Sequence, residues 1–326
     1  MGWVPVVSLA DPEAAVPAIA AACADVGFLT VVDHGVDASV LDDLWQTATS
    51  FFDLPDDAKR TVAMPRPGYP YGWAPFAYET LTASIGRTSP PDLKESFAIG
   101  PVDPARHVFV DADEAFAWSP NLWPNALPEL RLAWERAFRD FAALAARLLS
   151  IMAGALALPV DHFEPSIDRH TSAMRALNYP HLDGRHLDRQ ARAGQLRAGA
   201  HTDYGTLTVL LARADQPGLE VERPDGTWAE ADPVDGGLVV NLGDAMARWT
   251  NDRWRSTMHR VVLPAASDPA ASGDTRRQSI AFFHNANWDA RIECIPSCLA
   301  PGERPRYAPI DAGPHLMHKF RTTVGA

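Results

Sequence analysis

Cysteine is scarce in this chain of 326 residues, which contains only Cys23, Cys294 and Cys298. The number is odd and no two of the three form a Cys-x-x-Cys pair. This pattern favours reduced, buried thiols in a cytoplasmic protein over a disulfide framework.

Basic residues are outnumbered as well, since 29 Lys and Arg face 41 Asp and Glu, for a net charge of -12. This balance argues against nucleic acid or an anionic membrane as the main partner. The most apolar long window, residues 138–158, is interrupted by Arg147 and is typical of a core helix. The N-terminus lacks a basic segment followed by an apolar run, so no signal peptide is expected. We expect a cytoplasmic monomer or homodimer whose partner is a small molecule.

The composition supports a substantial core, because 47% of the residues are hydrophobic and 21% are charged. In the first half, Asp11 before Pro12 and later Asp37 are typical helix caps, although Pro17 leaves the start of the first helix open. The segment 65–128 is rich in proline, glycine and aromatics and is predicted to be irregular but packed. The elements expected here are strands over 4–9 and 28–32, a helix ending near Gly27, a helix from Asp37 to Phe52, and a scaffold helix over 130–152 whose apolar stripe packs on a sheet.

After residue 170 the pattern changes to short strands separated by turns. Such a series predicts a barrel or a double-sheet jelly roll, and with the helices before it an α+β fold that is mainly β. We expect one compact domain. The predicted strands are Ala173 to Tyr179, His201 to Leu211, Leu219 to Val221, Thr227 to Ala229, Gly237 to Leu242, Thr257 to Leu263 and Arg277 to Phe283.

A candidate metal site begins at His201-Thr202-Asp203, which is predicted to open a strand. Residues two apart in a strand point to the same face, so His201 and Asp203 would project together. His259, leading a later strand, is the best third ligand. Two histidines and one carboxylate leave positions open for substrate and oxygen, as in non-haem Fe(II) oxygenases.

Other histidines compete for these roles. The His-x-Asp pattern recurs at His181 and His186, but in a charged, glycine-containing segment that would not hold its side chains at fixed spacing. His284, His315 and His318 compete with His259 for the third position. His34 follows a strand in a turn and is predicted to be structural.

An anion-binding pair is predicted from Arg277 and Ser279, which share one face of a strand while Arg276 and His284 point away. A guanidinium binds a carboxylate through two parallel hydrogen bonds, and a buried one without a partner would be costly. An anionic ligand is therefore expected, the alternative being an internal salt bridge. Tyr179 is placed to add a phenolic hydrogen bond.

With these residues assembled, the chain resembles the isopenicillin N synthase-like family of Fe(II)/2-oxoglutarate-dependent oxygenases over nearly its full length. Each matching piece is short, and their order makes the set specific. The pieces are Val4-Pro5-Val6, Gly27-Phe28, Asp33-His34-Gly35-Val36, Phe51-Phe52-Asp53-Leu54-Pro55, Asp92-Leu93-Lys94-Glu95-Ser96-Phe97, Asn178-Tyr179-Pro180, His201-Thr202-Asp203, Val240-Asn241-Leu242-Gly243-Asp244, Trp249-Thr250-Asn251, Ser256-Thr257-Met258-His259-Arg260-Val261 and Arg277-Gln278-Ser279.

The resemblance implies a double-stranded β-helix, cupin-like core over 170–290, after an N-terminal helical and loop region over 1–125 and before a tail over 291–326 that covers the site. It also implies Fe(II) on His201, Asp203 and His259. The cosubstrate 2-oxoglutarate would be held by Arg277 and Ser279, with Tyr179 and Asn178 assisting. A stretch of small residues, Ala265 to Asp274, departs from the family pattern and is interpreted as a surface loop.

The resemblance implies a dioxygenase that uses O2 to hydroxylate a C–H bond of a small organic molecule, with desaturation or cyclisation as other outcomes. The first alternative is an Fe(II) oxidase that uses no 2-oxoglutarate; the second is a non-catalytic jelly-roll metal-binding protein or a zinc hydrolase. Expected substrate contacts are Phe283, Tyr71 and Phe76 within the loop 69–78, and the tail over 315–320. A specialised metabolite or amino-acid derivative would suit such walls.

Overall fold

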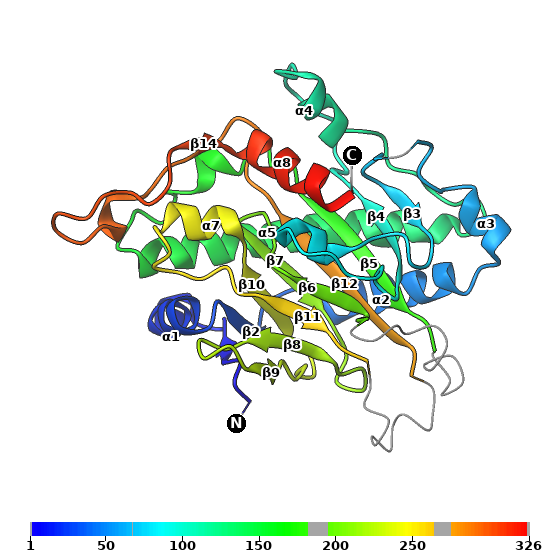
Figure 1. Ribbon diagram of the computed structural model, residues 1–326, viewed down its shortest axis with the longest axis horizontal. Coiled ribbons are helices and arrows are strands. Elements are labelled where there is room, and N and C mark those ends of the chain that lie inside the picture. The colour runs from blue at the N-terminus through cyan, green and yellow to red at the C-terminus, as the bar shows by residue number, and fades with distance from the viewer. Residues whose placement is uncertain (1, 67, 182–194, 264–274, 325–326) are drawn as a thin grey trace.

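Two sheets that face each other form the centre of the protein in a computed structural model that describes residues 2–66, 68–181, 195–263 and 275–324 (Figure 1). The large sheet has eight strands in the order β1-β2-β10-β7-β12-β5-β4-β3, and the small one has four in the order β6-β11-β8-β9. This arrangement confirms the predicted jelly roll with flanking helices. The strands of the large sheet are β1 (Val6–Ser8), β2 (Phe28–Val32), β3 (Gly72–Ala74), β4 (Glu95–Ile99), β5 (Ala173–Tyr179), β7 (Leu207–Leu211), β10 (Leu238–Leu242) and β12 (Arg277–His284), and those of the small sheet are β6 (Ala198–His201), β8 (Leu219–Glu222), β9 (Trp228–Glu230) and β11 (His259–Val261).

Helices cover the outer face of the large sheet, behind it in the view of Figure 1. The first begins at Pro12, where the Asp11 carboxylate accepts hydrogen bonds from the next backbone N–H groups, and Pro17 is accommodated inside it. The long α5 packs Phe138 and Phe141 against Phe282 of β12, which agrees with the predicted scaffold helix. The main helices are α1 (Pro12–Asp25), α2 (Ala38–Phe52), α3 (Asp56–Arg60), α4 (Ala112–Ala117), α5 (Pro128–Ala155), α7 (Asp244–Trp249) and α8 (Ala312–Val324).

The predicted strand over His201 to Leu211 is wrong. β6 ends at His201, β7 begins at Leu207, and the five residues between them carry the chain from the small sheet to the large one. A side chain cannot be fitted at Gly205, where a Cβ atom would lie 2.3 Å from the backbone oxygen of His284. The close approach of two backbones therefore sets the shape of this turn.

The segment 65–128 is also more regular than predicted. It supplies β3 and β4, which extend the large sheet beyond β5, a 3-10 helix η1 (Leu81–Ile85) and α4. All five residues of β4 are buried, so the strand has no alternation of polar and apolar residues that would reveal it.

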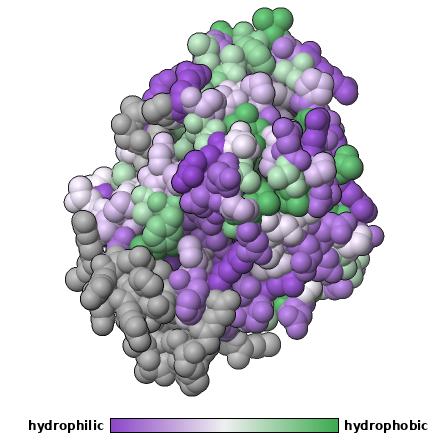
Figure 2. All heavy atoms as spheres, turned by 90° about the vertical axis from the view of Figure 1, so that its right-hand side faces the viewer, coloured by the Kyte–Doolittle hydropathy of each residue, from purple (hydrophilic) through white to green (hydrophobic). Residues whose placement is uncertain are grey.

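Polar residues predominate on the face shown in Figure 2, and hydrophobic residues are prominent at its top, at the height of α4 in Figure 1. The residues before α4 include the exposed Val108, Phe109 and Val110. In the described part of the chain, no helix combines the length and the apolar character needed to cross a membrane.

The contact between α5 and β12 gives a test of the fold. We expect Phe282→Ala to lower the free energy of unfolding by about 3 to 5 kcal/mol, because it empties a fully buried aromatic site. Leu132→Ala, on the solvent-facing side of α5 and 73% exposed, should change it by less than about 0.5 kcal/mol. Urea unfolding measures both, and equal losses would contradict this packing.

Candidate metal centre

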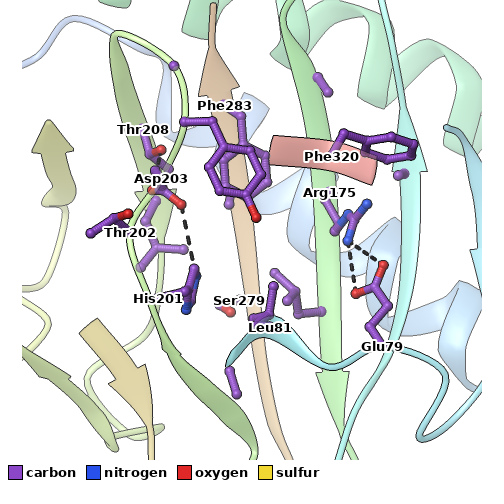
Figure 3. Close-up of a pocket in the computed structure, with 18 of the residues that line it drawn as sticks. Glu79, Leu81, Arg175, His201, Thr202, Asp203, Thr208, Ser279, Phe283 and Phe320 are labelled. Carbon is purple, nitrogen blue, oxygen red and sulfur yellow. Dashed lines mark hydrogen bonds and ion pairs between the residues drawn. The ribbon is translucent and has the colours of Figure 1, made fainter. Parts of the chain in front are cut away.

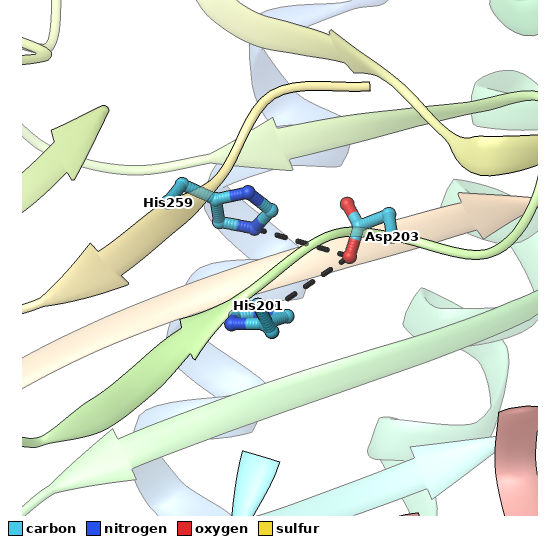
Figure 4. A group of neighbouring side chains, drawn as sticks. All are labelled: His201, Asp203 and His259. Carbon is cyan, nitrogen blue, oxygen red and sulfur yellow. Dashed lines mark ion pairs between the residues drawn. The ribbon is translucent and has the colours of Figure 1, made fainter. Parts of the chain in front are cut away.

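The pairing of β6 with β11 brings two imidazoles together. His201 and His259 are direct partners across these antiparallel strands, and their ring centroids are 4.3 Å apart. Asp203 approaches them from the turn that follows β6 (Figure 4). Residues from two distant segments of the sequence therefore meet at one point between the two sheets.

The ligand atoms of this group are oriented toward a common centre. Asp203 Oδ1 lies 3.9 Å from Nε2 of His201 and 3.9 Å from Nε2 of His259. Each Nδ1 donates to the carbonyl oxygen two residues earlier, that of Gly199 at 2.8 Å and that of Thr257 at 3.1 Å. These bonds assign the proton to Nδ1 and leave both Nε2 lone pairs free for a metal.

The other oxygen of Asp203 is held by the large sheet. Its Oδ2 accepts hydrogen bonds from Asn241 Nδ2 at 2.7 Å and from Thr208 Oγ1 at 2.6 Å. Burial alone would raise the pKa of Asp203, but the two histidines and these two donors lower it overall. The residue is therefore a carboxylate with one oxygen anchored and one directed at the imidazoles.

Burial also keeps the first histidine neutral. It lowers the pKa of His201 to about 3, and the adjacent His259 adds to the effect. A neutral imidazole is the form that binds a metal, so the group is ready to ligate at neutral pH. Among the described residues, His201, Asp203 and His259 are the group whose ligand atoms, all within 4.8 Å of one another, suit a metal ion.

A buried guanidinium lies on the inner face of the large sheet, beyond the imidazoles. Arg277 is 2% exposed and donates to Ser279 Oγ at 3.2 Å and to the backbone oxygens of Gln216 and Pro217. Its Cζ lies 5.1 Å from the ring centroid of Tyr179. Burial lowers the pKa of Arg277, and within the described ranges no carboxylate pairs with it. The alternative of an internal salt bridge therefore has no partner there, and the expected anionic ligand would complete the site.

These groups open into one cavity of about 230 Å³ between the sheets (Figure 3). His201, Asp203 and His259 line one part of it, together with Arg277, Ser279 and Tyr179. Apolar side chains close the remainder, including Leu81 of η1, Phe283 of β12, and Leu316, Met317 and Phe320 of α8. The tail therefore contributes to the cavity wall.

Two expected contacts need correction. Asn178 alternates with Tyr179 along β5, so its side chain lies on the opposite face, where it bonds Glu95 at 2.8 Å and Arg276 at 2.9 Å. Phe76 is 40% exposed and lies outside the cavity wall. Tyr71 does line the cavity, and its hydroxyl donates to the Ala117 carbonyl.

The competing histidines do not join the cluster. His284 is buried on the helix side of β12 with Thr206 Oγ1 2.7 Å from its Nδ1, and His34 bonds Gly236 in a turn. His315 is buried in α8, and His318 of that helix is exposed. His186 and the whole stretch from Ala265 to Asp274 lie outside the described residues.

The sequence patterns did not single out a charged pair in the cavity wall. Arg175, on the inward face of β5, pairs with Glu79, which precedes η1. Alternation along β5 places Arg175 on the same face as Tyr179, so the sequence pattern could have placed Arg175 in the cavity wall. Glu79 is 96 residues away in the sequence, and no local pattern announces the pair.

Comparison with known proteins shows the family. Residues 171–286 match the 2OG-Fe(II) oxygenase superfamily, and residues 4–126 match the N-terminal region described as non-haem dioxygenase in morphine synthesis. The chain is 33% identical to validamycin A dioxygenase of Streptomyces hygroscopicus subsp. limoneus, over 90% of this chain and 77% of the relative. It is 34% identical to proline hydroxylase buaE of Petromyces alliaceus, over 90% of this chain and 88% of the relative. The chain belongs to the 2OG-Fe(II) oxygenase superfamily.

Solved structures agree with this assignment. A full-length Neurospora crassa protein in complex with alpha-KG is similar with a TM-score of 0.82 and 28% identity, over 97% of this chain and 95% of that one. A 2OG-Fe(II) oxygenase family protein from Caulobacter crescentus has a TM-score of 0.83 and 28% identity, over 98% and 99% of the two chains. The predicted class is confirmed: the protein is an Fe(II)/2-oxoglutarate-dependent dioxygenase that acts on a small molecule.

The anchoring of Asp203 generates a prediction about metal affinity. We expect Asn241→Leu or Thr208→Val to weaken Fe(II) binding roughly 10- to 100-fold, because either change frees the carboxylate to rotate. Anaerobic Fe(II) titration measures the effect. Thr227→Val, an exposed threonine on the hairpin before β9, is the control and should bind as the unchanged protein does. Unaltered affinity in both variants would contradict the anchoring role.

Proposed function

We propose that His201, Asp203 and His259 hold the Fe(II) of this dioxygenase and that the reaction is hydroxylation of a small organic substrate. The observation that carries this proposal is the convergence of two Nε2 atoms and one carboxylate oxygen within 4.8 Å on one side of a cavity. Three ligands on one side match the preference of non-haem Fe(II) oxygenases. When bound, the iron with its cosubstrate and O2 supplies the oxidising chemistry: a C–H bond becomes C–OH while 2-oxoglutarate becomes succinate and CO2.

Arg277 and Ser279 would hold the distal carboxylate of 2-oxoglutarate, with the Tyr179 ring beneath the guanidinium. The guanidinium is buried and faces the cavity without an acidic partner among the described residues, which favours a carboxylate as its ligand. Family membership and the alpha-KG complex of the Neurospora crassa protein favour 2-oxoglutarate over the alternative in which this arginine holds a substrate carboxylate.

The apolar side chains around the cavity would exclude water and orient the substrate. Phe283 lies beside Asp203 and Thr208 in Figure 3, and Met317 and Phe320 close the wall from α8. Exclusion of water protects the reacting carbon from competing reactions. We propose that residues 1–125, 170–290 and 291–326 act as one catalytic unit, because the cavity takes residues from all three.

Relatives carry names of small polar substrates, including validamycin A, proline and homoarginine, and a second structure of the Neurospora crassa protein holds thymine. A compact polar metabolite or amino-acid derivative is therefore our proposal for the substrate class. Cytoplasmic location and a monomeric or homodimeric state stay predictions from the composition.

The ligand set is tested by substitution. His201→Ala, Asp203→Ala and His259→Ala should each abolish stoichiometric Fe(II) binding and 2-oxoglutarate-dependent succinate formation, since two ligands hold Fe(II) poorly. His162→Ala, which alters an exposed histidine before the 3-10 helix η2 (Glu164–Ser166), should retain both. Full iron binding by any of the three variants would remove that residue from the ligand set.

Two adjacent arginines give a matched test of the cosubstrate site. Arg277→Met should weaken 2-oxoglutarate binding by about 1.5 to 3 kcal/mol or more, because it removes charge-assisted hydrogen bonds. Arg276→Met alters the opposite face of β12, where Arg276 bonds Asn178 and Asp53, and should leave binding nearly unchanged. Anaerobic titration of the Fe(II) protein with 2-oxoglutarate, followed by its visible absorbance, gives both affinities. The reverse order would contradict the assignment.

A further inference from the structure

A second guanidinium faces the cavity, apart from the one assigned to 2-oxoglutarate. Arg175 lies on β5, two inward positions before Tyr179. Its partners on the neighbouring strands are Ala281 of β12 and Ala98 of β4, whose small side chains leave room for the arginine to extend into the cavity. In Figure 3, Arg175 and Glu79 lie across the cavity from His201 and Asp203.

The pairing of Arg175 uses only part of its hydrogen-bonding capacity. Its Nη1 donates to both carboxylate oxygens of Glu79, at 2.7 Å and 3.0 Å. A pair that only stabilised the fold would favour the two-nitrogen fork, which engages both oxygens in parallel. Here Nε and Nη2 make no hydrogen bond to any described residue, and the side chain is 24% exposed in the cavity wall.

Glu79 belongs to a charge network that is balanced without a ligand. Its carboxylate also lies 3.4 Å from Lys94 Nζ, and Lys94 in turn pairs with Asp92 at 2.8 Å. Burial would raise the pKa of Glu79, but Arg175 and Lys94 outweigh it and lower the pKa to about 2. Two cations and two carboxylates therefore cancel at neutral pH.

We propose that Arg175 and Glu79 form the recognition site for the polar end of the substrate, and that this end is electrically neutral and carries a hydrogen-bond acceptor next to a donor. The acceptor would bind the unused guanidinium N–H groups, and the donor would bind the Glu79 carboxylate. This inference rests on the proposed function of the cavity. Two chemical sources supply such a pair: the carboxylate and ammonium of an α-amino acid, or the carbonyl and N–H of a cyclic amide or imide.

The charge balance disfavours a simple monocarboxylate. Its charge would enter beside Glu79, where the two described cations, Arg175 and Lys94, are already neutralised and do not offset the cost of burial. The rest of the substrate would contact Leu81, Phe283 and Phe320. A polar end bound at Arg175 would leave the other end directed across the cavity at the metal ligands, where the C–H bond must lie.

The test is anaerobic calorimetry on the protein loaded with Fe(II) and 2-oxoglutarate. Three probe sets are titrated: the α-amino acids including L-proline and homoarginine, the cyclic imides uracil and thymine, and the monocarboxylates benzoate and hexanoate. Binding by the amino acids or by the imides supports the proposal and identifies the source. Binding by the monocarboxylates alone, or by none of the probes, overturns it.

Substitutions test whether Arg175 and Glu79 are the residues that bind the probe. For the tightest probe, Arg175→Met should weaken binding by about tenfold or more, because hydrogen bonds to a charged group are lost. Glu79→Gln keeps an acceptor but removes the charge. It should weaken the binding of amino acids by a similar factor and the binding of imides by less than about threefold. Arg213→Met, which alters a surface arginine paired with Asp42, is the matched control. Unchanged binding by both Arg175→Met and Glu79→Gln overturns the proposal.

Titration of the same preparations with 2-oxoglutarate distinguishes a failure of the proposed function from a failure of the recognition site alone. If the unchanged protein does not bind 2-oxoglutarate with Fe(II), the proposed function of the cavity fails and this inference fails with it. If it binds 2-oxoglutarate while the probes show no dependence on Arg175 or Glu79, only the recognition site is wrong. Urea unfolding of Arg175→Met and Glu79→Gln verifies that each variant is folded in the calorimeter.

Discussion

The register between β6 and β11 is the constraint on which the site depends. Because His201 and His259 are direct partners across an antiparallel pair, their rings lie side by side with Nε2 of each facing Asp203. A shift of one residue in either strand would turn one imidazole to the opposite face. The same strand pairing that builds the small sheet therefore also sets the spacing of the two nitrogens that we propose as ligands.

Asp203 links this small sheet to the large one. The carboxylate lies in the turn between β6 and β7, and its anchored oxygen is held by Thr208 of β7 and Asn241 of β10. The proposed ligand group is thus fixed from both sheets of the jelly roll. Gly205 is required in the same turn because its backbone approaches His284 too closely for any side chain. The positions of His201, Asp203 and His259 relative to one another therefore depend on how the two sheets pack.

Sequence patterns predict the elements that are continuous and fail where the chain changes sheets. The alternation of Arg277 and Ser279 along β12 is visible in the sequence, because that strand is unbroken. The pairing of His201 with Asp203 is predicted by assuming a continuous strand, yet a tertiary turn brings the two together. The same alternation rule, applied to β5, separates Asn178 from Tyr179.

The features that the sequence does not reveal depend on contacts between distant segments. β4 is buried on both faces and shows no alternation, and Glu79 approaches Arg175 only because the chain folds back between them, with η1 packed against β6 and α8. The family resemblance supplies the enzyme class and the cofactors, which the comparisons confirm. The resemblance says nothing of the balanced charges opposite the metal ligands, which only the three-dimensional structure brings together.

The most direct test of the account is X-ray absorption at the iron edge of protein loaded anaerobically with Fe(II). We expect an iron site with two imidazole ligands and light-atom oxygen ligands, and the loss of one imidazole contribution in any His259→Ala protein that can be forced to hold iron at high concentration. A spectrum without imidazole scattering, or one that His259→Ala leaves unchanged, would contradict the central claim that β6 and β11 together hold the metal.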